Sequence, residues 1–392
     1  MIKIIQNINE LESVESEWND LFEENPGSNV FQSFDWNYIW LKHFLRKNDN
    51  IFIIAVYNDK ENGKLEAIAP FFIRRFFLFL KSLMFISYDY SDYLDIIIRK
   101  NCDKEKIYSE IFGTIFLNNK SQRIADIINL KQVSKDTLLL ISDYLNKIKK
   151  ISLNYKESGS CYYFNLPDNI DDYMKRFNSK QRYNILKRAE KAETVNIKYI
   201  ASSSANIDKS LFMKYLNIFF ELHQRRWKNK GKRGVFYNEK IKSFFKDLFI
   251  SLFNKNRITL SALEINNGNI IASAVCFDYA GKKQVYLPGF DTEYSCYHPG
   301  IVLIYNDIKE AINKKYKEFD FLKGGEEYKQ RFGAVKRENY KLYLYKNKII
   351  FYLYKINLFL EKEIKEKSAD IIHNIFKKMK ILRIRSEEEN LR

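Results

Sequence analysis

The hydrophobic and polar positions in the second half of the chain follow two clear periods. Alternation with a period of two predicts three successive strands, over 257–265, 270–279 and 284–290. Hydrophobic residues then recur every three or four positions over 301–316, which predicts a helix. The remaining elements expected in this half are a strand over 319–323, a short helix over 326–332, a strand over 339–345, and upstream helices over 179–193, 211–228 and 239–254.

A weaker copy of the same order can be traced in the first half. The expected elements are helices over 11–23 and 35–47, paired strands over 51–57 and 65–73, strands over 84–87 and 94–99, a helix over 104–117, a strand over 123–128 and a helix over 134–147. This repetition predicts an α/β protein with two mixed-sheet halves, residues 1–165 and 166–348. Residues 349–392 mix apolar and basic residues at helical spacing, which predicts a basic amphipathic helical tail.

Composition indicates a globular chain and limits the classes of partner that it is expected to bind. Of 392 residues, 46% are hydrophobic and 16% aromatic, which excludes a disordered protein. The 66 Lys and Arg against 49 Asp and Glu give a net charge of +17, which favours an anionic partner, although lysine is also abundant in ordinary stretches. Four scattered cysteines and four histidines favour neither a metal site nor a disulfide framework.

Two apolar stretches are candidates for a membrane span, and neither fits one. Residues 68–86 are interrupted by Arg74, Arg75 and Lys81, and residues 349–360 are too short to cross a bilayer. The first ten residues show no secretory signal pattern, so we expect a cytoplasmic protein. The tail either packs on its own domain or lies on an anionic membrane at the inner face.

Glycine is concentrated in one part of the second half. Seven of the 13 glycines fall between residues 268 and 333. A strand splayed at Leu287-Pro288-Gly289 would offer unpaired backbone groups to an extended amide ligand. A helix opening at Pro299-Gly300 would offer its N-terminus to a phosphate. A ligand with both parts is coenzyme A.

The order of elements and four segments resemble the CelD-like branch of the GNAT acyltransferases, which is related to the FemAB-type aminoacyltransferases. The segments are 31–36, 91–94, 222–227 and, most specifically, 320–333. The resemblance covers the chain to about residue 345 and implies two GNAT-like halves with an acetyl-CoA or acyl-CoA donor. Residues 295–300 depart from the usual GNAT phosphate loop. FemAB relatives use aminoacyl-tRNA but commonly carry a coiled-coil insertion, and no such heptad run precedes the tail, which favours the thioester.

Five residues are candidates for catalysis. His223 lies on the hydrophobic stripe of a predicted helix and is either a core histidine or a general base, and Asp291 is the second candidate base or a solvated turn residue. Tyr286 and Tyr328 could donate to a leaving thiolate. The resemblance implies that Lys329 lies near the acyl-transfer site; otherwise it is a surface charge.

The candidate binding residues fall into two sets. The donor set is Leu287, Gly289, His298, Pro299, Gly300, Ile301, Lys323 and Gly324. The acceptor set is Phe31, Trp36, Asp92, Tyr93, Arg182, Arg226 and Trp227. Arg182 belongs to a basic helix start, which indicates either a bound anion or a solvated basic face.

These observations predict an acyltransferase that moves an acyl group from a thioester to an amine or hydroxyl of a sugar or cell-envelope precursor, as in polysaccharide biosynthesis. One alternative is a FemAB-like enzyme using aminoacyl-tRNA, which is the one case in which a nucleic acid is expected. The other is a non-catalytic scaffold of an envelope complex at the membrane surface.

Overall fold

The computed structural model describes the chain except residues 26, 59–62, 77–79, 118–123, 267 and 365–392. The elements of its first part are β1 (Ile2–Ile5), α1 (Ile8–Glu12), α2 (Glu15–Glu23), the 3₁₀ helix η1 (Val30–Gln32), α3 (Phe34–Phe44), β2 (Asn50–Tyr57), β3 (Leu65–Arg75), β4 (Lys81–Phe85), β5 (Ile97–Ile98), α4 (Lys104–Leu117), β6 (Ile127–Val133) and α5 (Lys135–Ile148). The second part contains β7 (Ser152–Asn165), α6 (Ile170–Lys175), α7 (Ser179–Thr194), β8 (Lys198–Ser202), α8 (Lys209–Asn229), η3 (Val235–Tyr237), α9 (Glu239–Asn254), β9 (Ile258–Ile265), β10 (Asn269–Tyr279), β11 (Lys282–Phe290), η4 (Thr292–Tyr297), α10 (Pro299–Asn313), β12 (Glu318–Lys323), α11 (Glu327–Arg331) and β13 (Val335–Tyr345).

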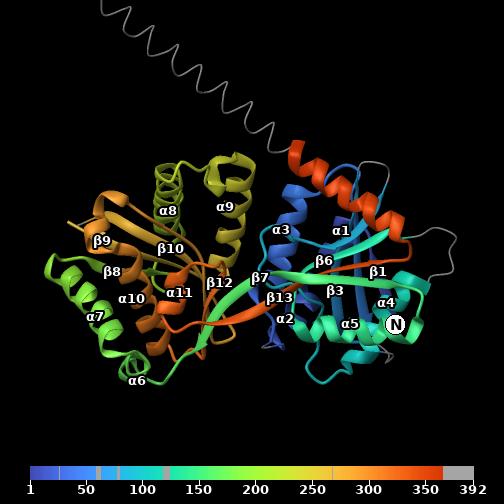
Figure 1. Ribbon diagram of the computed structural model, residues 1–392, viewed down its shortest axis with the longest axis horizontal. Coiled ribbons are helices and arrows are strands. Elements are labelled where there is room, and N and C mark those ends of the chain that lie inside the picture. Colours follow the sequence, from blue (N-terminus) through green and yellow to red (C-terminus); the bar gives the residue numbers. More distant parts are fainter. Residues whose placement is uncertain (26, 59–62, 77–79, 118–123, 267, 365–392) are drawn as a thin grey trace, which may run out of the picture.

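One continuous mixed sheet runs through both halves, with helices on its two faces (Figure 1). Its order is β1-β2-β3-β4-β6-β13-β7-β12-β11-β10-β9-β8, and β5 pairs with β3 at the side. From either edge, three antiparallel pairings are followed by one parallel pairing, β4 with β6 or β11 with β12. The two halves therefore repeat one topology, which confirms the predicted α/β fold with two similar halves.

The halves share their central strands. β7 pairs with the whole of β13, from Ser152 to Tyr163, and the second half of β13 also pairs with β6. The last part of β7, from Cys161 to Asn165, pairs with β12 on its other side. Sequence patterning did not predict β7, because four consecutive residues, 154–157, are exposed and Gly159 interrupts the run. The division near residue 165 falls at the end of this strand. We keep it as a proposal, since the sheet itself is not interrupted there.

Most other expected elements are present with shifted ends. The helices expected over 104–117, 211–228 and 239–254 agree closely with α4, α8 and α9. The strand expected over 123–128 instead begins at Ile127, the one over 94–99 shrinks to Ile97–Ile98, and the helix over 11–23 is broken into α1 and α2. β8 was also missed.

The largest hydrophobic cluster joins the two halves on one face of the sheet. It contains Trp36 from α3 and Phe249 from α9, together with Phe277 from β10. The ring centroids of Trp36 and Phe277 are 5.4 Å apart in an edge-to-face pair. Burial of this many aromatic rings fixes α3 against α9, and so orients the first half relative to the second.

A further helix over residues 348–364 follows β13 and covers part of the first half, at the end of the described chain (Figure 1). Tyr354 is fully buried, and its hydroxyl contacts Ser82 and accepts a hydrogen bond from Asn129 at 2.7 Å. The predicted tail is thus helical to residue 364, and residues 365–392 lie outside the described chain. None of the helices described is long and apolar enough to cross a membrane.

Candidate functional site

The site is built where β11 and β12 diverge. These parallel strands pair only from Lys282 to Gln284 on β11, and β11 then continues alongside β10 as far as Phe290. The splay predicted for this strand is therefore confirmed. The register between β10 and β11 shifts at Tyr286, which is an extra residue without a partner on β10. The shift does not fall at Pro288-Gly289.

A groove of about 350 Å³ opens beside the splay, bounded by β11, η4, the start of α10, α11 and the end of α8. Six predicted site residues line it: Arg226, His298, Pro299, Gly300, Ile301 and Tyr328. Pro288, Phe290 and Ile304 add apolar surface. The groove is mainly apolar, which suits an acyl chain or the pantetheine part of a thioester donor.

Two cations of α7 lie near the start of α10, which forms one end of the groove. His298 adopts the left-handed conformation (φ 50°, ψ 50°) and is the N-cap of α10, which begins with Pro299. Burial and the nearby charges of Arg188 and Lys191 on α7 lower the pKa of His298. A helix N-terminus beside two cations favours a phosphate. Arg188 and Lys191 lie on the same helix as Arg182, further from its basic start.

Arg226 carries an unsatisfied donor at the groove wall. Its guanidinium lies 4.7 Å from the ring centroid of Phe290 and donates to the Pro288 carbonyl at 3.1 Å. Its Nε is buried and has no partner among the described residues. Burial lowers the pKa of Arg226. Arg226 thus lines the groove with its guanidinium held between the Phe290 ring and the Pro288 carbonyl.

Lys329 is buried at the end of the splay. Its Nζ donates to the carbonyls of Leu322 at 3.2 Å and Lys323 at 3.0 Å, and lies 3.1 Å from the carboxylate of Glu326. Gly324 has a φ of 138°, and a Cβ there would lie 2.8 Å from Nζ of Lys329. The glycine therefore makes room for the lysine, which holds the turn after β12.

Asp92 and Tyr93 reach the same turn from the first half. Asp92 accepts from the Lys323 backbone N–H at 3.1 Å, and burial raises the pKa of its carboxyl. The Tyr93 hydroxyl donates to Asp320 at 2.7 Å. Two residues predicted from the 91–94 segment thus join the halves at β12.

Three other predicted residues lie in the core between the halves. Phe31 and Trp36 are fully buried and surround the ring of Tyr286. The Tyr286 hydroxyl donates to the Tyr90 carbonyl at 2.7 Å, and burial raises its pKa well above the usual value. None of the three lines the groove, so their position is that of packing residues.

His223 and its predicted neighbours form a second packed group. Trp227 donates to Nε2 of His223 at 3.1 Å, and the imidazole packs edge-on against Phe236. Burial, with a smaller effect of Arg226, lowers the pKa of His223 to about 4. A Cβ at Gly289 would lie 2.6 Å from the His223 backbone nitrogen. Gly289 thus brings β11 against α8. Nδ1 of His223 is buried and has no hydrogen-bond partner among the described residues, so a role as general base stays a proposal beside that of a core histidine.

The remaining predicted residues have local structural partners. Asp291 is paired with Arg225 and caps η4 through the Glu293 N–H at 3.1 Å. Arg182 donates to the carbonyls of Met174 and Phe177, at the end of α6. Leu287 packs against the cluster shared by the two halves.

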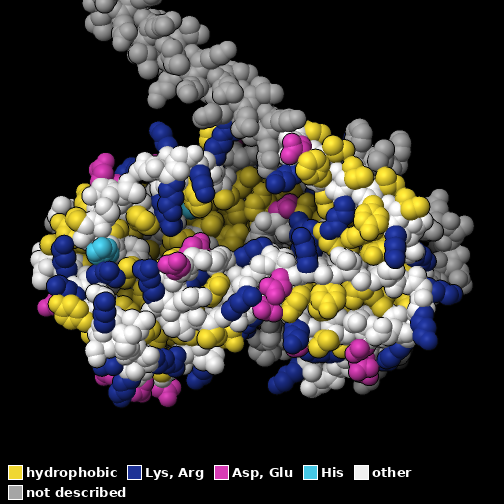
Figure 2. Space-filling view, viewed as in Figure 1, with side chains coloured by type: hydrophobic (Ala, Val, Ile, Leu, Met, Phe, Trp, Pro, Cys, Tyr) yellow, Lys and Arg dark blue, Asp and Glu magenta, His cyan; other side chains and the backbone are white. Residues whose placement is uncertain are grey.

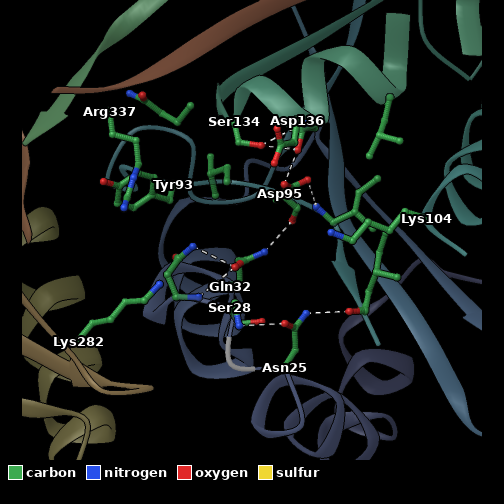
Figure 3. Close-up of a pocket in the computed structure, with 18 of the residues that line it drawn as sticks. Asn25, Ser28, Gln32, Tyr93, Asp95, Lys104, Ser134, Asp136, Lys282 and Arg337 are labelled. Carbon is green, nitrogen blue, oxygen red and sulfur yellow. Dashed lines mark hydrogen bonds between the residues drawn. The ribbon is translucent and has the colours of Figure 1, made fainter. Parts of the chain in front are cut away.

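A second, polar pocket of about 270 Å³ lies between the halves (Figure 3). Tyr93 and Arg337 line it, with Lys282 from β11 and Asp95 from the first half. Tyr93 is the only predicted site residue in this lining, although Gln32 and Leu94 belong to the segments 31–36 and 91–94. Lys282, Glu318 and Arg337 come from three separate strands, so no local motif could have joined them to these segments.

Comparison with known proteins supports the fold. The family model described as the acetyltransferase (GNAT) domain matches residues 179–330. FemX is similar in structure, with a TM-score of 0.61 and 12% identity over 84% of this chain and 95% of that chain. The C-terminal domain of a putative lysylphosphatidylglycerol synthetase from Agrobacterium fabrum is also similar, with a TM-score of 0.54 and 11% identity. The match covers 89% of this chain and 97% of that chain. L-PGS from Bacillus licheniformis has a TM-score of 0.52 and 11% identity, over 88% of this chain and 96% of that chain. A search of the curated proteins finds no match.

The described residues contain no group of His, Cys, Asp and Glu that could hold a metal ion. The site therefore consists of an apolar groove with a cationic end, a buried lysine at a strand splay, and a polar pocket between two halves of repeated topology.

Proposed function

We propose that this chain, whose fold is that of the GNAT acyltransferases and their FemAB-type relatives, transfers an acyl group from an acyl thioester to an amine or hydroxyl of a sugar or cell-envelope precursor. The observation that carries the proposal is the groove at the β11–β12 splay. It combines an apolar wall with a helix N-terminus beside Arg188 and Lys191, as a donor with an acyl arm and phosphates requires.

The residues present fit coenzyme A as the carrier of the acyl group. His298, Gly300 and the cations of α7 would hold its phosphates, and Phe290 and Ile304 would contact its apolar arm. When bound, coenzyme A supplies an activated thioester. Lys329 keeps the turn after β12 in place beside the splay, and Tyr328 lines the groove.

The acceptor is proposed to enter through the polar pocket between the halves. Tyr93 lines that pocket and binds Asp320, whose other oxygen accepts from the Leu322 N–H at 2.7 Å. The Leu322 carbonyl in turn accepts from Lys329. Two sets of hydrogen bonds, joined through the backbone of Leu322, thus connect the acceptor pocket with Lys329 at the proposed transfer site.

The donor class is tested by thermal unfolding with coenzyme A, acetyl-CoA, longer acyl-CoAs and aminoacyl-tRNA. A ligand at about 100 times its dissociation constant stabilises a protein by ~2.7 kcal/mol. We expect a rise in Tm with an acyl-CoA. A shift with aminoacyl-tRNA alone would support the FemAB-like alternative, and no shift with any donor would favour the scaffold.

A matched pair of substitutions at Gly300 tests the groove itself. A Cβ at this position would lie 3.6 Å from the Phe290 ring, an ordinary contact, so Gly300→Ala should keep donor binding and stabilise the chain by about 0.4–1 kcal/mol. Gly300→Phe fills the groove and should weaken acyl-CoA binding by roughly tenfold or more, about 1.4 kcal/mol. Calorimetric titration measures both. Equal affinity for the two variants would place the donor elsewhere.

We also propose that the helix over 348–364 contacts an anionic membrane. One face packs on the first half, whereas the opposite face exposes seven large apolar side chains: Ile349, Tyr352, Leu353, Ile356, Phe359, Leu360 and Ile364. Figure 2 shows hydrophobic side chains along this helix with cationic ones beside them. The sequence that follows, residues 371–385, has five Lys and Arg and no Asp or Glu. An exposed apolar stripe near basic residues is typical of an interfacial helix.

Sedimentation with vesicles tests this contact. The full chain should bind vesicles containing phosphatidylglycerol more strongly than vesicles of phosphatidylcholine alone. Ile356→Glu with Phe359→Glu should reduce binding by roughly tenfold, because each places a charge in the apolar boundary. Tyr183→Glu with Leu186→Glu, on exposed apolar positions of α7, is the matched control. An equal loss of vesicle binding in both double variants would contradict a specific role of the helix.

A further inference from the structure

Each of the four central strands carries a lysine in one neighbourhood of the sheet. The strands are adjacent in the order β6-β13-β7-β12, and they contribute Lys131, Lys341, Lys156 and Lys323 in that order. Lys341 and Lys156 are direct partners across β13 and β7. Four cations on neighbouring strands repel one another, so the arrangement costs stability unless an anion joins it.

A fifth lysine reaches this group from the C-terminal helix. Nζ of Lys355 lies 3.9 Å from the ring centroid of Tyr343, and Nζ of Lys341 lies 4.8 Å from the same ring. Lys131 lies 4.1 Å from the ring of Tyr88. The lysines are thus held against aromatic faces between the helix and the central strands. Figure 2 shows cationic side chains around the middle of the molecule on this side.

A glycine on β7 makes room for one member of the cluster. Gly159 has a φ of 119°, and a Cβ there would lie 2.6 Å from Cε of Lys323 and 3.4 Å from its Nζ. The Lys323 side chain therefore crosses the β7 backbone instead of pointing away from it. Glycine, which has no side chain, thus occupies the position in β7 where this lysine passes.

Four of the five lysines have no ion pair with a carboxylate in the described part of the chain. In the described part of the chain, the nearby carboxylates are Asp89, 3.9 Å from Lys131, and Asp92, which accepts from the Lys323 backbone. No described carboxylate forms an ion pair with the side chain of Lys156, Lys323, Lys341 or Lys355. Burial, followed by the charges of the neighbouring lysines, lowers the pKa of Lys341 to about 7.

We propose that this lysine cluster, residues 131, 156, 323, 341 and 355, is a binding site for a phosphate or diphosphate group. Ammonium groups on separate strands can surround such an anion and donate to its oxygens. The site is built from other residues than the donor groove, where the phosphates face α10 and α7. It therefore stands or falls independently of the proposed acyl donor.

Titration calorimetry with inorganic pyrophosphate, in the presence of saturating coenzyme A to fill the groove, tests the site. The full chain should bind pyrophosphate and take up protons near pH 7, because the anion raises the pKa of Lys341. Lys341→Gln should raise the dissociation constant at least tenfold and remove the proton uptake. The variant should fold, since it removes a charge that its neighbours repel.

Lys147→Gln, on an exposed lysine of α5, is the control and should leave the affinity unchanged within about twofold. A second arm of the experiment uses phosphatidylglycerol vesicles, and it distinguishes a soluble phosphate ligand from a lipid headgroup. Binding of pyrophosphate that depends on Lys341 indicates a soluble phosphate ligand, and dependence in the vesicle arm alone indicates a lipid headgroup. Equal binding by Lys341→Gln and the unsubstituted chain in both arms would overturn the proposal.

Discussion

Replacing Lys283 with methionine is expected to destabilise the protein by about 3–5 kcal/mol, the cost of leaving buried carboxylates without their cation. Lys283 is fully buried on β11, with Nζ 2.6 Å from Glu310 and 3.7 Å from Asp278. Although burial favours the neutral acid, Lys283 lowers the pKa of Glu310 to about 2. Burial raises the pKa of Asp307, beside it on α10, to about 7.

The prediction has a matched control in Lys314, which binds the same carboxylate. Its Nζ lies 2.7 Å from Glu310, but its side chain is 40% exposed. Lys314→Met should therefore cost no more than about 1 kcal/mol. Urea unfolding of both variants measures the difference. If the two losses were equal, burial of the Lys283 cluster would not be what holds α10 against β11.

This cluster explains how the donor groove keeps its shape. Lys283 lies on β11 and Glu310 on α10, which are two walls of the groove. No local pattern indicates this cluster, because residues 278 and 283 of the β10–β11 hairpin meet residues 307 and 310 of α10 only in the folded chain. Local patterning finds residues whose partners are near in sequence, and it cannot pair charges across a fold.

The predictions that held depended on local backbone chemistry. Pro288 and the Pro299-Gly300 pair located the groove from the sequence, because proline and glycine limit what the backbone can do next. Tyr286 and His223 were harder to interpret, since aromatic and histidine side chains serve both cores and sites. The structure places both among aromatic rings and outside the lining of the groove.

The elements that could be predicted are those whose sequence pattern lies within one half of the chain. The repeated order of elements indicated two halves, but β7 is exposed along four successive residues and lacks a clear alternation. Its stability comes from pairing with β13 and β12, which lie more than 150 residues further along the chain. An element held by such distant partners carries little local signal.

Lys329→Met is expected to lower turnover about 100-fold, the size of effect seen when one preorganised polar group is removed from an active site. The methionine side chain is unbranched, like that of lysine, and is one heavy atom shorter. It leaves the Leu322 and Lys323 carbonyls without their buried donor and removes a positive charge at the splay. The rate is measured as release of coenzyme A from the acyl-CoA that raises Tm most, and donor affinity is measured by calorimetry.

Two outcomes separate a role at the transfer site from a purely structural one. If Lys329 acts on the reaction, Lys329→Met should bind the donor within about threefold of the unsubstituted chain while turnover falls, since the groove itself is lined by other residues. Glu326→Gln removes the exposed partner of Lys329 but keeps the two carbonyl contacts, so its turnover should change less than about threefold. A folded Lys329→Met variant with unchanged turnover would restrict this lysine to holding the turn after β12, and the proposed transfer site would then have to lie elsewhere along the splay.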